Sequence, residues 1–250
     1  MHESIKWISS PKRPVLGIGD IHVWLIHLVV AAINQDKLNS FLSADEKLRA
    51  DRFYFDHHRI RYVTGRGTMR SILSRYVGIA PDQLEFHYGR QGKPYFESDT
   101  AGNFLGFNLS HSGDLAILAV GWNRNIGIDT ERIRVDRSYE EIALAYFSTN
   151  EFEFLTGLQS ENKATFFFNS WTRKEAHLKA RGGGLQIPLD DFDVSLEPGA
   201  LLSLPRGQDR RWQMVAFEAA RGYPAALVYD GSLADVRYFS WDRLVDGEEG

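Results

Sequence analysis

The sequence of 250 residues contains no cysteine, which excludes disulfide bonds, thiolate metal sites and cysteine nucleophiles. Two hydrolase motifs are absent as well. The histidines form no His-Glu-x-x-His zinc motif, and the adjacent His57 and His58 would diverge on a helix. No Gly-x-Ser-x-Gly segment presents a serine nucleophile. The sequence therefore supports neither a zinc hydrolase nor a serine hydrolase.

Long apolar segments are also missing. Residues 1–10 lack the apolar core of a signal peptide. The longest apolar run, residues 21–33, contains two histidines and is too short to span a bilayer. We therefore expect a cytoplasmic protein that does not enter a membrane, which agrees with the absence of cysteine. The formal net charge of −4 argues against general affinity for nucleic acid.

Positive charge is nevertheless concentrated in one segment of the chain, between residues 46 and 75. A local basic patch inside a mildly acidic protein suits a small polyanionic ligand better than a nucleic-acid polymer. The acidic residues of the segment are Glu46, Asp51 and Asp56, and the basic residues are Lys47, Arg49, Arg52, Arg59, Arg61, Arg66, Arg70 and Arg75.

Hydrophobic periodicity predicts an α+β fold built from two comparable lobes, residues 1–121 and 122–250. Capping boxes at Ser43 and Ser148, each with a glutamate three residues later, predict helix starts. Helical spacing predicts helices from there to residue 77, over 138–146, after Ser148 and over 161–181. The expected strands are 21–30, 84–87, 95–96, 107–109, 116–120, 126–130, 192–196, 212–218, 225–229 and 236–241.

The run Ile-Gly-Ile-Asp-Thr-Glu at 126–131 ends a predicted strand with two carboxylates. Asp129 and Glu131 share one face of the strand, because alternate side chains point the same way. Neighbouring carboxylates repel each other unless a cation lies between them, and oxygen ligands favour magnesium among phosphates. The alternative is a solvated strand end.

The predicted helix 161–181 contains a second set of polar residues. Trp171, Glu175 and Lys179 are spaced by four, so they share a helical face. Glu175 and Lys179 alone could equally form an ordinary surface ion pair. Trp171 is more typical of a core anchor than of a ligand contact.

Two turns complete the candidate set. The segment 108–114, Asn-Leu-Ser-His-Ser-Gly-Asp, places Ser110 and His111 where backbone N–H groups can face an anion. The segment 89–95 presents Gly92 and Lys93 before a proline-stiffened strand. Taken alone, the histidine could be structural and the second turn a simple hairpin.

Taken together and in order, the runs GKPYF, FNLSHSG, GIDTE, FSTNEFEFL and NSWTRKEAHLKARGGGL resemble the large, two-lobed class of 4'-phosphopantetheinyl transferases. The match extends from about residue 41 to residue 194. The resemblance implies two similar lobes related by a pseudo-twofold axis, with the active site in the cleft between them. It further implies that lobe 1–121 binds the nucleotide of coenzyme A and that lobe 122–250 supplies the metal carboxylates.

The resemblance also implies roles for individual residues. Asp129, Glu131 and Glu175 would bind Mg²⁺, and Glu175 or else Glu151 would accept the proton of the attacking serine. A glutamate, Glu46, stands where relatives often carry a basic residue, for which Lys47 could substitute. The remaining contacts to coenzyme A are expected from Arg49, Arg66, Arg70, Gly92, Lys93, Ser110, His111 and Lys179.

The implied reaction moves phosphopantetheine from coenzyme A to a serine of an apo acyl or peptidyl carrier protein. Carrier proteins commonly bear acidic helices, so docking is expected near Arg132, Ile133 and Arg134. We expect a monomer, because two lobes on one chain can form the cleft. The alternatives are a metal-dependent hydrolase of nucleotide pyrophosphates and a non-catalytic module that binds coenzyme A. The sequence does not disclose the pathway that the carrier serves.

Overall fold

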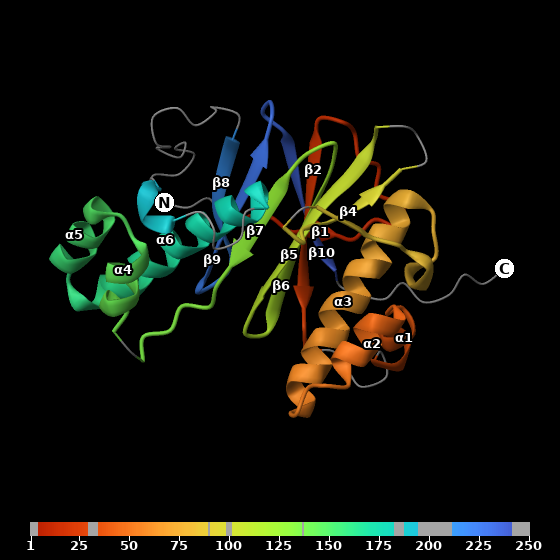
Figure 1. Cartoon of the computed structure of the whole chain (residues 1–250), viewed down its shortest axis with the longest axis horizontal. Coiled ribbons are helices and arrows are strands. Elements are labelled where there is room, and N and C mark those ends of the chain that lie inside the picture. The colour runs from red at the N-terminus through yellow and green to blue at the C-terminus, as the bar shows by residue number, and fades with distance from the viewer. Residues whose placement is uncertain are drawn as a thin grey trace.

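The computed structural model of the protein describes residues 5–29, 35–89, 91–98, 102–136, 138–182, 188–194 and 212–241. These residues form an α+β protein with two sheets (Figure 1). The larger sheet has the order β1-β10-β2-β6-β5-β4-β3 and the smaller has the order β7-β9-β8. The strands of the larger sheet are β1 (Ile8–Ser9), β10 (Asp235–Trp241), β2 (Asp20–His27), β6 (Leu115–Trp122), β5 (Phe104–Ser112), β4 (Pro94–Glu97) and β3 (His87–Tyr88).

Four layers build the described part of the molecule. Helix α3 (Asp56–Val77) packs on one face of the larger sheet, where it meets Trp24 of β2 and Leu118 of β6. The alternate residues Val23 and Ile117 point to the other face and pack against the smaller sheet. Helix α6 (Ser160–Arg181) then covers the outer face of the smaller sheet. The smaller sheet comprises β7 (Ile126–Thr130), β9 (Tyr223–Asp230) and β8 (Trp212–Ala220).

Shorter helices flank the two long ones (Figure 1). Beside α3 lie α1 (Gln35–Ser40) and α2 (Ala44–Ala50), and α2 begins at the capping box of Ser43. Beside α6 lie α4 (Glu140–Tyr146) and α5 (Thr149–Gly157), and α5 begins at the capping box of Ser148. Both predicted helix starts are therefore confirmed. The 3₁₀ turns are η2 (Pro81–Gln83) and η4 (Leu189–Asp191).

The two sheets repeat one strand order. In the larger sheet β2, β6 and β5 are antiparallel neighbours, and in the smaller sheet β7, β9 and β8 follow the same order. In both cases the first strand is followed along the chain by a helix of 22 residues, α3 or α6. The larger sheet also contains β10, which pairs in parallel with β2. A strand from residues 122–250 therefore completes the sheet formed mainly by residues 1–121.

Most predicted elements lie within two or three residues of the observed ones, and two strands differ. The strand predicted at 84–87 begins only at His87, because Leu84 instead follows the η2 turn and packs into the core. The strand predicted at 192–196 is wrong for Phe192–Val194, which follow the η4 turn; residues 195 and 196 lie outside the described part. No helix in the described ranges is long and apolar enough to cross a bilayer.

Candidate active site

The candidate site lies along the line where the two sheets meet, between β5 and β7. Alternate residues of β5 point at β7 and bind it through their side chains. The three hydrogen bonds are Ile128 N–H to Asn108 Oδ1 (2.8 Å), Ser110 Oγ to Asp129 Oδ1 (2.7 Å) and Ser112 Oγ to Glu131 Oε2 (2.6 Å). The run Asn-Leu-Ser-His-Ser therefore holds both carboxylates of the GIDTE run in place.

A glycine brings the helix carboxylate to this seam. A Cβ atom on Gly127 would lie 2.0 Å from the carbonyl oxygen of Ala176 and 2.2 Å from the backbone nitrogen of Ala180. Only glycine allows the α6 backbone to lie directly on β7. Because Glu175 and Lys179 flank these alanines on α6, their side chains reach the end of β7 where Asp129 lies.

Asp129 is the centre of the polar cluster. Its carboxylate is buried, and its Oδ1 accepts hydrogen bonds from Ser110 Oγ and from Lys179 Nζ, the latter at 2.5 Å. Lys179 also donates to Ser110 Oγ at 3.1 Å. The second oxygen, Asp129 Oδ2, is buried and has no hydrogen-bond partner among the described residues. A buried carboxylate oxygen without a donor is costly, so this atom points to a cation or donor that the protein alone does not supply.

The negative charge of Asp129 contributes to raised pKa values at two further carboxylates, Glu131 and Glu175. Burial raises the pKa of Glu175, and the negative charge of Asp129 raises it further. Burial also raises the pKa of Glu131, against the opposing effect of its hydrogen bond from Ser112. In the described residues, however, no three His, Asp or Glu side chains already stand as a set that could hold a metal ion. The ammonium of Lys179 instead neutralises Asp129.

The predicted face of α6 is confirmed. Trp171, Glu175 and Lys179 are half-buried, whereas the residues between them are buried. Trp171 stacks on Phe167, as expected of a core anchor, with 5.7 Å between ring centroids. His111 lies between Ser110 and Ser112. Although its side chain is exposed, partial desolvation by the surrounding protein and the positive charge of Lys179 lower its pKa.

A hollow of about 240 Å³ joins this cluster to the Gly-Lys-Pro turn. Gly92 and Lys93 line it together with Asn108, Glu175 and Lys179. The structure therefore brings the predicted GKP and α6 residues to one cavity, together with Asn108 of β5. The turn requires glycine at position 92, because the φ of 79° there is unfavourable for any residue with a side chain.

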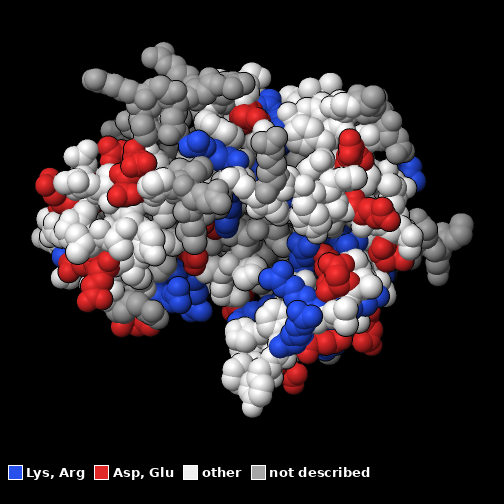
Figure 2. All heavy atoms as spheres, in the orientation of Figure 1, with Lys and Arg blue, Asp and Glu red and all other residues white. Residues whose placement is uncertain are grey.

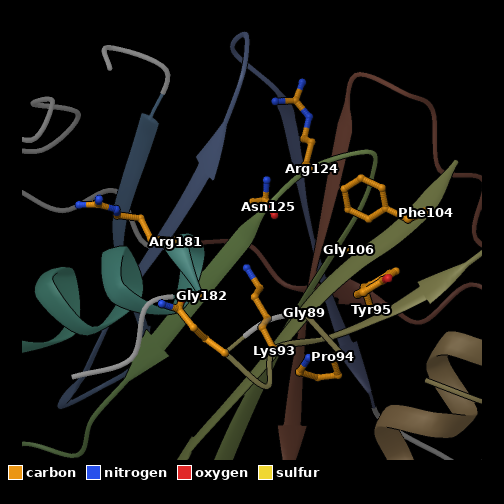
Figure 3. Close-up of a pocket in the computed structure, with 11 residues that line it drawn as sticks. Gly89, Lys93, Pro94, Tyr95, Phe104, Gly106, Arg124, Asn125, Arg181 and Gly182 are labelled. Atoms are coloured by element: carbon orange, nitrogen blue, oxygen red, sulfur yellow. The ribbon is translucent and has the colours of Figure 1, made fainter. Parts of the chain in front are cut away.

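Lys93 connects the turn to the end of α6. Its Nζ donates to the carbonyl of Ala180 at 2.9 Å, and burial lowers its pKa to about 8. Figure 3 shows Lys93 within a second cavity of about 440 Å³, with Tyr95 and Phe104 on one side and Arg181 on the other. Cations at a helix C-terminus are stabilised by the helix dipole, so Lys93 also helps to hold α6 against the turn.

The predicted nucleotide-binding arginines lie on the α2 and α3 side, and two of them are already paired. Buried Glu46 accepts hydrogen bonds from Arg66 at 2.9 Å and from Arg70 at 2.5 Å. Arg70 donates in addition to the carbonyls of Pro81 and Leu84. Arg49, by contrast, lies over the ring of Tyr62 with its guanidinium carbon 5.6 Å from the centroid.

Glu151 stands apart from the seam, in a buried network of α5 and α6. Its Oε2 lies 2.8 Å from Nζ of Lys174, and its Oε1 accepts from the backbone N–H of Val194. Lys174, which is fully buried, also donates to the carbonyls of Leu189 and Phe192 at 2.6 Å each. These contacts tie α6 to α5 and to the segment after η4.

Sequence reasoning did not single out Asn108, Ser112, Gly127 or Lys174 for these contacts. The period of two in Asn108, Ser110 and Ser112 was the available signal, because it places three polar side chains on one face of a strand. For Lys174 there was none, since its partners are backbone carbonyls of a distant segment.

The sequence of this chain matches two known protein-family models. A family model described as the 4'-phosphopantetheinyl transferase superfamily matches residues 125–228. A second, described as the N-terminal part of a 4'-phosphopantetheinyl transferase, matches residues 34–123. The two matches together include both long helices and most strands of the two sheets, and they leave out β1, β2 and β10.

Individual relatives carry the same description. The chain is 42% identical to the 4'-phosphopantetheinyl transferase HetI of Nostoc sp. over 192 residues, which are 77% of this chain and 81% of HetI. It is 30% identical to the 4'-phosphopantetheinyl transferase Sfp of Bacillus subtilis over 214 residues, 84% of this chain and 92% of Sfp. A Bacillus pumilus relative, psf-1, is 33% identical over 173 residues, 68% of this chain and 71% of psf-1.

Proposed function

Because this chain belongs to the 4'-phosphopantetheinyl transferase superfamily and is a 4'-phosphopantetheinyl transferase, we propose that its substrates are coenzyme A and an apo acyl or peptidyl carrier protein. The carrier's serine oxygen forms a bond to the β-phosphorus of coenzyme A. The bond from that phosphorus to 3',5'-ADP breaks, and the nucleotide leaves. A nucleophile from the partner is consistent with the absence of a nucleophile motif in this chain.

The observation that carries this proposal is the buried, half-paired carboxylate of Asp129. Its Oδ2 lacks a partner among the described residues. Glu131 and Glu175 lie close enough for the charge of Asp129 to raise their pKa values. We assign these three carboxylates to Mg²⁺, since oxygen donors suit that ion. When bound, the ion would counter the charge of the pyrophosphate and of the leaving group.

The other residues of the seam would hold the substrate. Lys179 and Lys93 border the hollow of about 240 Å³ and would face phosphate oxygens, and Ser110 accepts a hydrogen bond from Lys179. His111, the next residue of β5, would contact the same phosphate groups. On the α2 and α3 side, Arg49 is the arginine best placed for the nucleotide, because Glu46 already binds the other two. Arg66 and Arg70 would then act mainly by fixing Glu46 and the start of α2.

Glu175 is our candidate for the general base. It is half-buried and lines the hollow, and burial together with the charge of Asp129 raises its pKa, which makes the carboxylate a stronger base. Glu151 is less suited, because it is buried and both of its oxygens already accept hydrogen bonds or contact Lys174.

The two-lobed arrangement is part of the proposal. The repeated strand order and the two 22-residue helices support a pseudo-twofold relation between the halves, with the site where they meet. A division into lobes 1–121 and 122–250 would then have one exception. Strand β10 belongs to residues 122–250 but pairs with β2 in the sheet of the first lobe. A monomer in the cytoplasm stays a prediction from the sequence.

The test is transfer itself. Purified protein, coenzyme A, Mg²⁺ and a panel of apo-carrier proteins should give a carrier whose mass rises by one phosphopantetheine. Asp129→Ala should lower this rate by about three orders of magnitude, as expected for loss of charge stabilisation, with an unchanged thermal transition. Full-rate transfer in excess EDTA would contradict the magnesium assignment. Release of 3',5'-ADP without any carrier would favour a pyrophosphate hydrolase instead.

A further inference from the structure

The N-terminal end of α3 carries an exposed aromatic surface, which we call the α3 knob and define as Phe53–His58. Tyr54 is 90% exposed and Phe55 is 54% exposed. The rings pack mainly on one another, with 4.9 Å between the centroids of Tyr54 and Phe55 and 4.1 Å between those of His57 and His58. A contiguous exposed apolar surface of this kind commonly marks a site of interaction.

Local stability does not explain these residues. Helices α2 and α5 begin at Ser43 and Ser148, which form capping boxes. Helix α3 instead begins at Phe55, which makes no side-chain capping hydrogen bond. A phenylalanine at this position leaves the first N–H groups of the helix without the oxygen that serine, threonine or aspartate would provide. The start of α3 therefore lacks the capping box that α2 and α5 have, as do the starts of α4 and α6.

Positive charge borders the knob. A hollow of about 620 Å³ is lined by the apolar side chains of Leu48 and Phe53 and by Arg49 and Arg52, with Asp45 at its edge. Neither guanidinium pairs with a carboxylate within the described residues. Figure 2 shows an uncharged projection at the lower end of the molecule, with blue Lys and Arg atoms above it beside a central hollow.

The knob lies beside the candidate active site. Arg61, five residues into α3, donates to Asp114 in the turn between β5 and β6 at 2.6 Å. The same turn lies against Arg132, whose Cδ would be 3.3 Å from a Cβ on Gly113. Five residues of helix span about 8 Å. A protein that covers the end of β5 with an interface of ordinary size therefore also reaches the knob.

We propose that the α3 knob and the adjoining residues Leu48 and Arg52 dock an acidic, amphipathic helix of the carrier protein, with an apolar side chain over Leu48 and Phe53 and carboxylates facing Arg52. Arg49, in the same hollow, keeps the role toward the nucleotide proposed above. The proposal rests on the function proposed above, because the occupant is the protein substrate of that reaction. The knob and Arg132 then form two opposite contacts for one carrier, on either side of the β5–β6 turn.

The test uses the double variant Arg52→Glu/Tyr54→Ser in the full-length protein. We expect the KM for the apo-carrier to rise at least about 10-fold, whereas the KM for coenzyme A, the kcat and the thermal transition stay unchanged. The matched control is Arg237→Glu/Leu233→Ser, which makes the same kind of change at exposed residues of β10 and its preceding turn. A carrier in which one helix glutamate is replaced by arginine should recover much of the lost affinity for the double variant.

Each other outcome overturns the docking proposal. An unchanged KM for the carrier in the double variant means that the knob takes no part in docking. A wild-type dimer that the variant converts to a monomer assigns the knob to a second copy of the chain. Binding of the wild type, but not the variant, to anionic phospholipid vesicles assigns it to a membrane surface. If the wild type itself modifies no carrier, the proposed function fails first.

Discussion

Helices α3 and α6 cover equivalent strands but meet them differently. Each has 22 residues and lies on a sheet with one strand order. The α6 backbone contacts β7 directly, because Gly127 has no side chain. On α3 the glycine is in the helix, where a Cβ on Gly67 would lie 2.5 Å from the carbonyl oxygen of Leu38 in α1. A glycine therefore lets a helix lie directly on a strand in one half, whereas in the other half a glycine lets two helices lie close together.

The polar residues differ accordingly. On the α6 side, carboxylates gather at the sheet seam around Asp129, where one oxygen lacks a partner in the described residues. On the α3 side, arginines surround Glu46, whose two oxygens are both used. The buried carboxylate on the α6 side thus keeps one oxygen without a partner in the described residues, whereas the one on the α3 side is fully paired. In the function proposed above, the first side would hold the cation and Arg49 on the second side would face the nucleotide.

The largest stability effect is expected from the buried pair of α6. Lys174→Met should lower the free energy of unfolding by about 3–5 kcal/mol, because it leaves Glu151 buried without its counter-charge. Lys163→Met on the same helix is the control: its pair with Glu140 is partly exposed and should be worth about 1 kcal/mol or less. Denaturant titration measures both.

A companion variant separates structure from chemistry at Glu151. Glu151→Gln should reduce stability while leaving most of the kcat of the folded protein. A loss of kcat by orders of magnitude at unchanged stability would instead make Glu151 the base, and the preference for Glu175 would be wrong.

The next effect concerns the close contact of helix and strand. Gly127→Ala should lower the free energy of unfolding by about 1–3 kcal/mol, as overpacking does. It should also lower transfer by about 100-fold, because a displacement of about 1 Å in a catalytic group has that effect. Gly157→Ala, where nothing lies within 4 Å of the new Cβ, should keep full activity. Full activity in Gly127→Ala would show that α6 need not touch β7.

The α3 side gives the corresponding smaller effect. Glu46→Gln should cost about 1–3 kcal/mol, since the buried guanidinium of Arg70 loses its charged acceptor but keeps two carbonyls. Asp51→Asn should change stability by less than about 0.5 kcal/mol, because its pair with Arg59 is exposed. Equal changes in the free energy of unfolding would mean that Glu46 and its two arginines stabilise the fold no more than an exposed ion pair does.

The sequence predicted elements whose signals are local. Strand β7 was placed to the residue, because five apolar-patterned residues lie between turns, and α6 to within one residue, because glycines follow it. Partners distant in sequence were not predictable. The pairing of β10 with β2 joins residues more than 200 positions apart, and Phe192–Val194 were mistaken for a strand because their backbone carbonyl serves Lys174 rather than a sheet neighbour.

The same distinction applies to the site. Asp129, Glu131, Glu175 and Lys179 were chosen from spacing, and the structure brings Asp129 and Lys179 into direct contact. The fit between Gly127 and α6 depends on a contact across 49 residues, from 127 to 176, that no local pattern encodes. The pairing of Arg66 and Arg70 with Glu46 was likewise not foreseen, although the acidic residue itself stood out.

The smallest effect compares one buried histidine from each half. In β2, Nδ1 of His22 forms one hydrogen bond with the hydroxyl of Tyr76. In α6, His177 packs between the rings of Phe192 and Trp212. Burial lowers the pKa of each to about 4. Beside His22, the charge of Arg237 lowers the pKa further, whereas Asp20 and Asp235 oppose this.

A histidine with a lowered pKa binds its proton more tightly in the unfolded chain, so stability is greatest above about pH 6.5 and falls as the pH drops toward 4. At pH 5.5 each buried histidine should cost on the order of 1 kcal/mol relative to pH 7. His22→Phe should remove about half of this acid-induced loss, as measured by denaturant titration at the two pH values. His87→Phe, at an exposed site, should leave the loss unchanged. An acid response that His22→Phe does not alter would show that β2 tolerates a charged imidazole, and that the interior of the first half is more polar than its packing indicates.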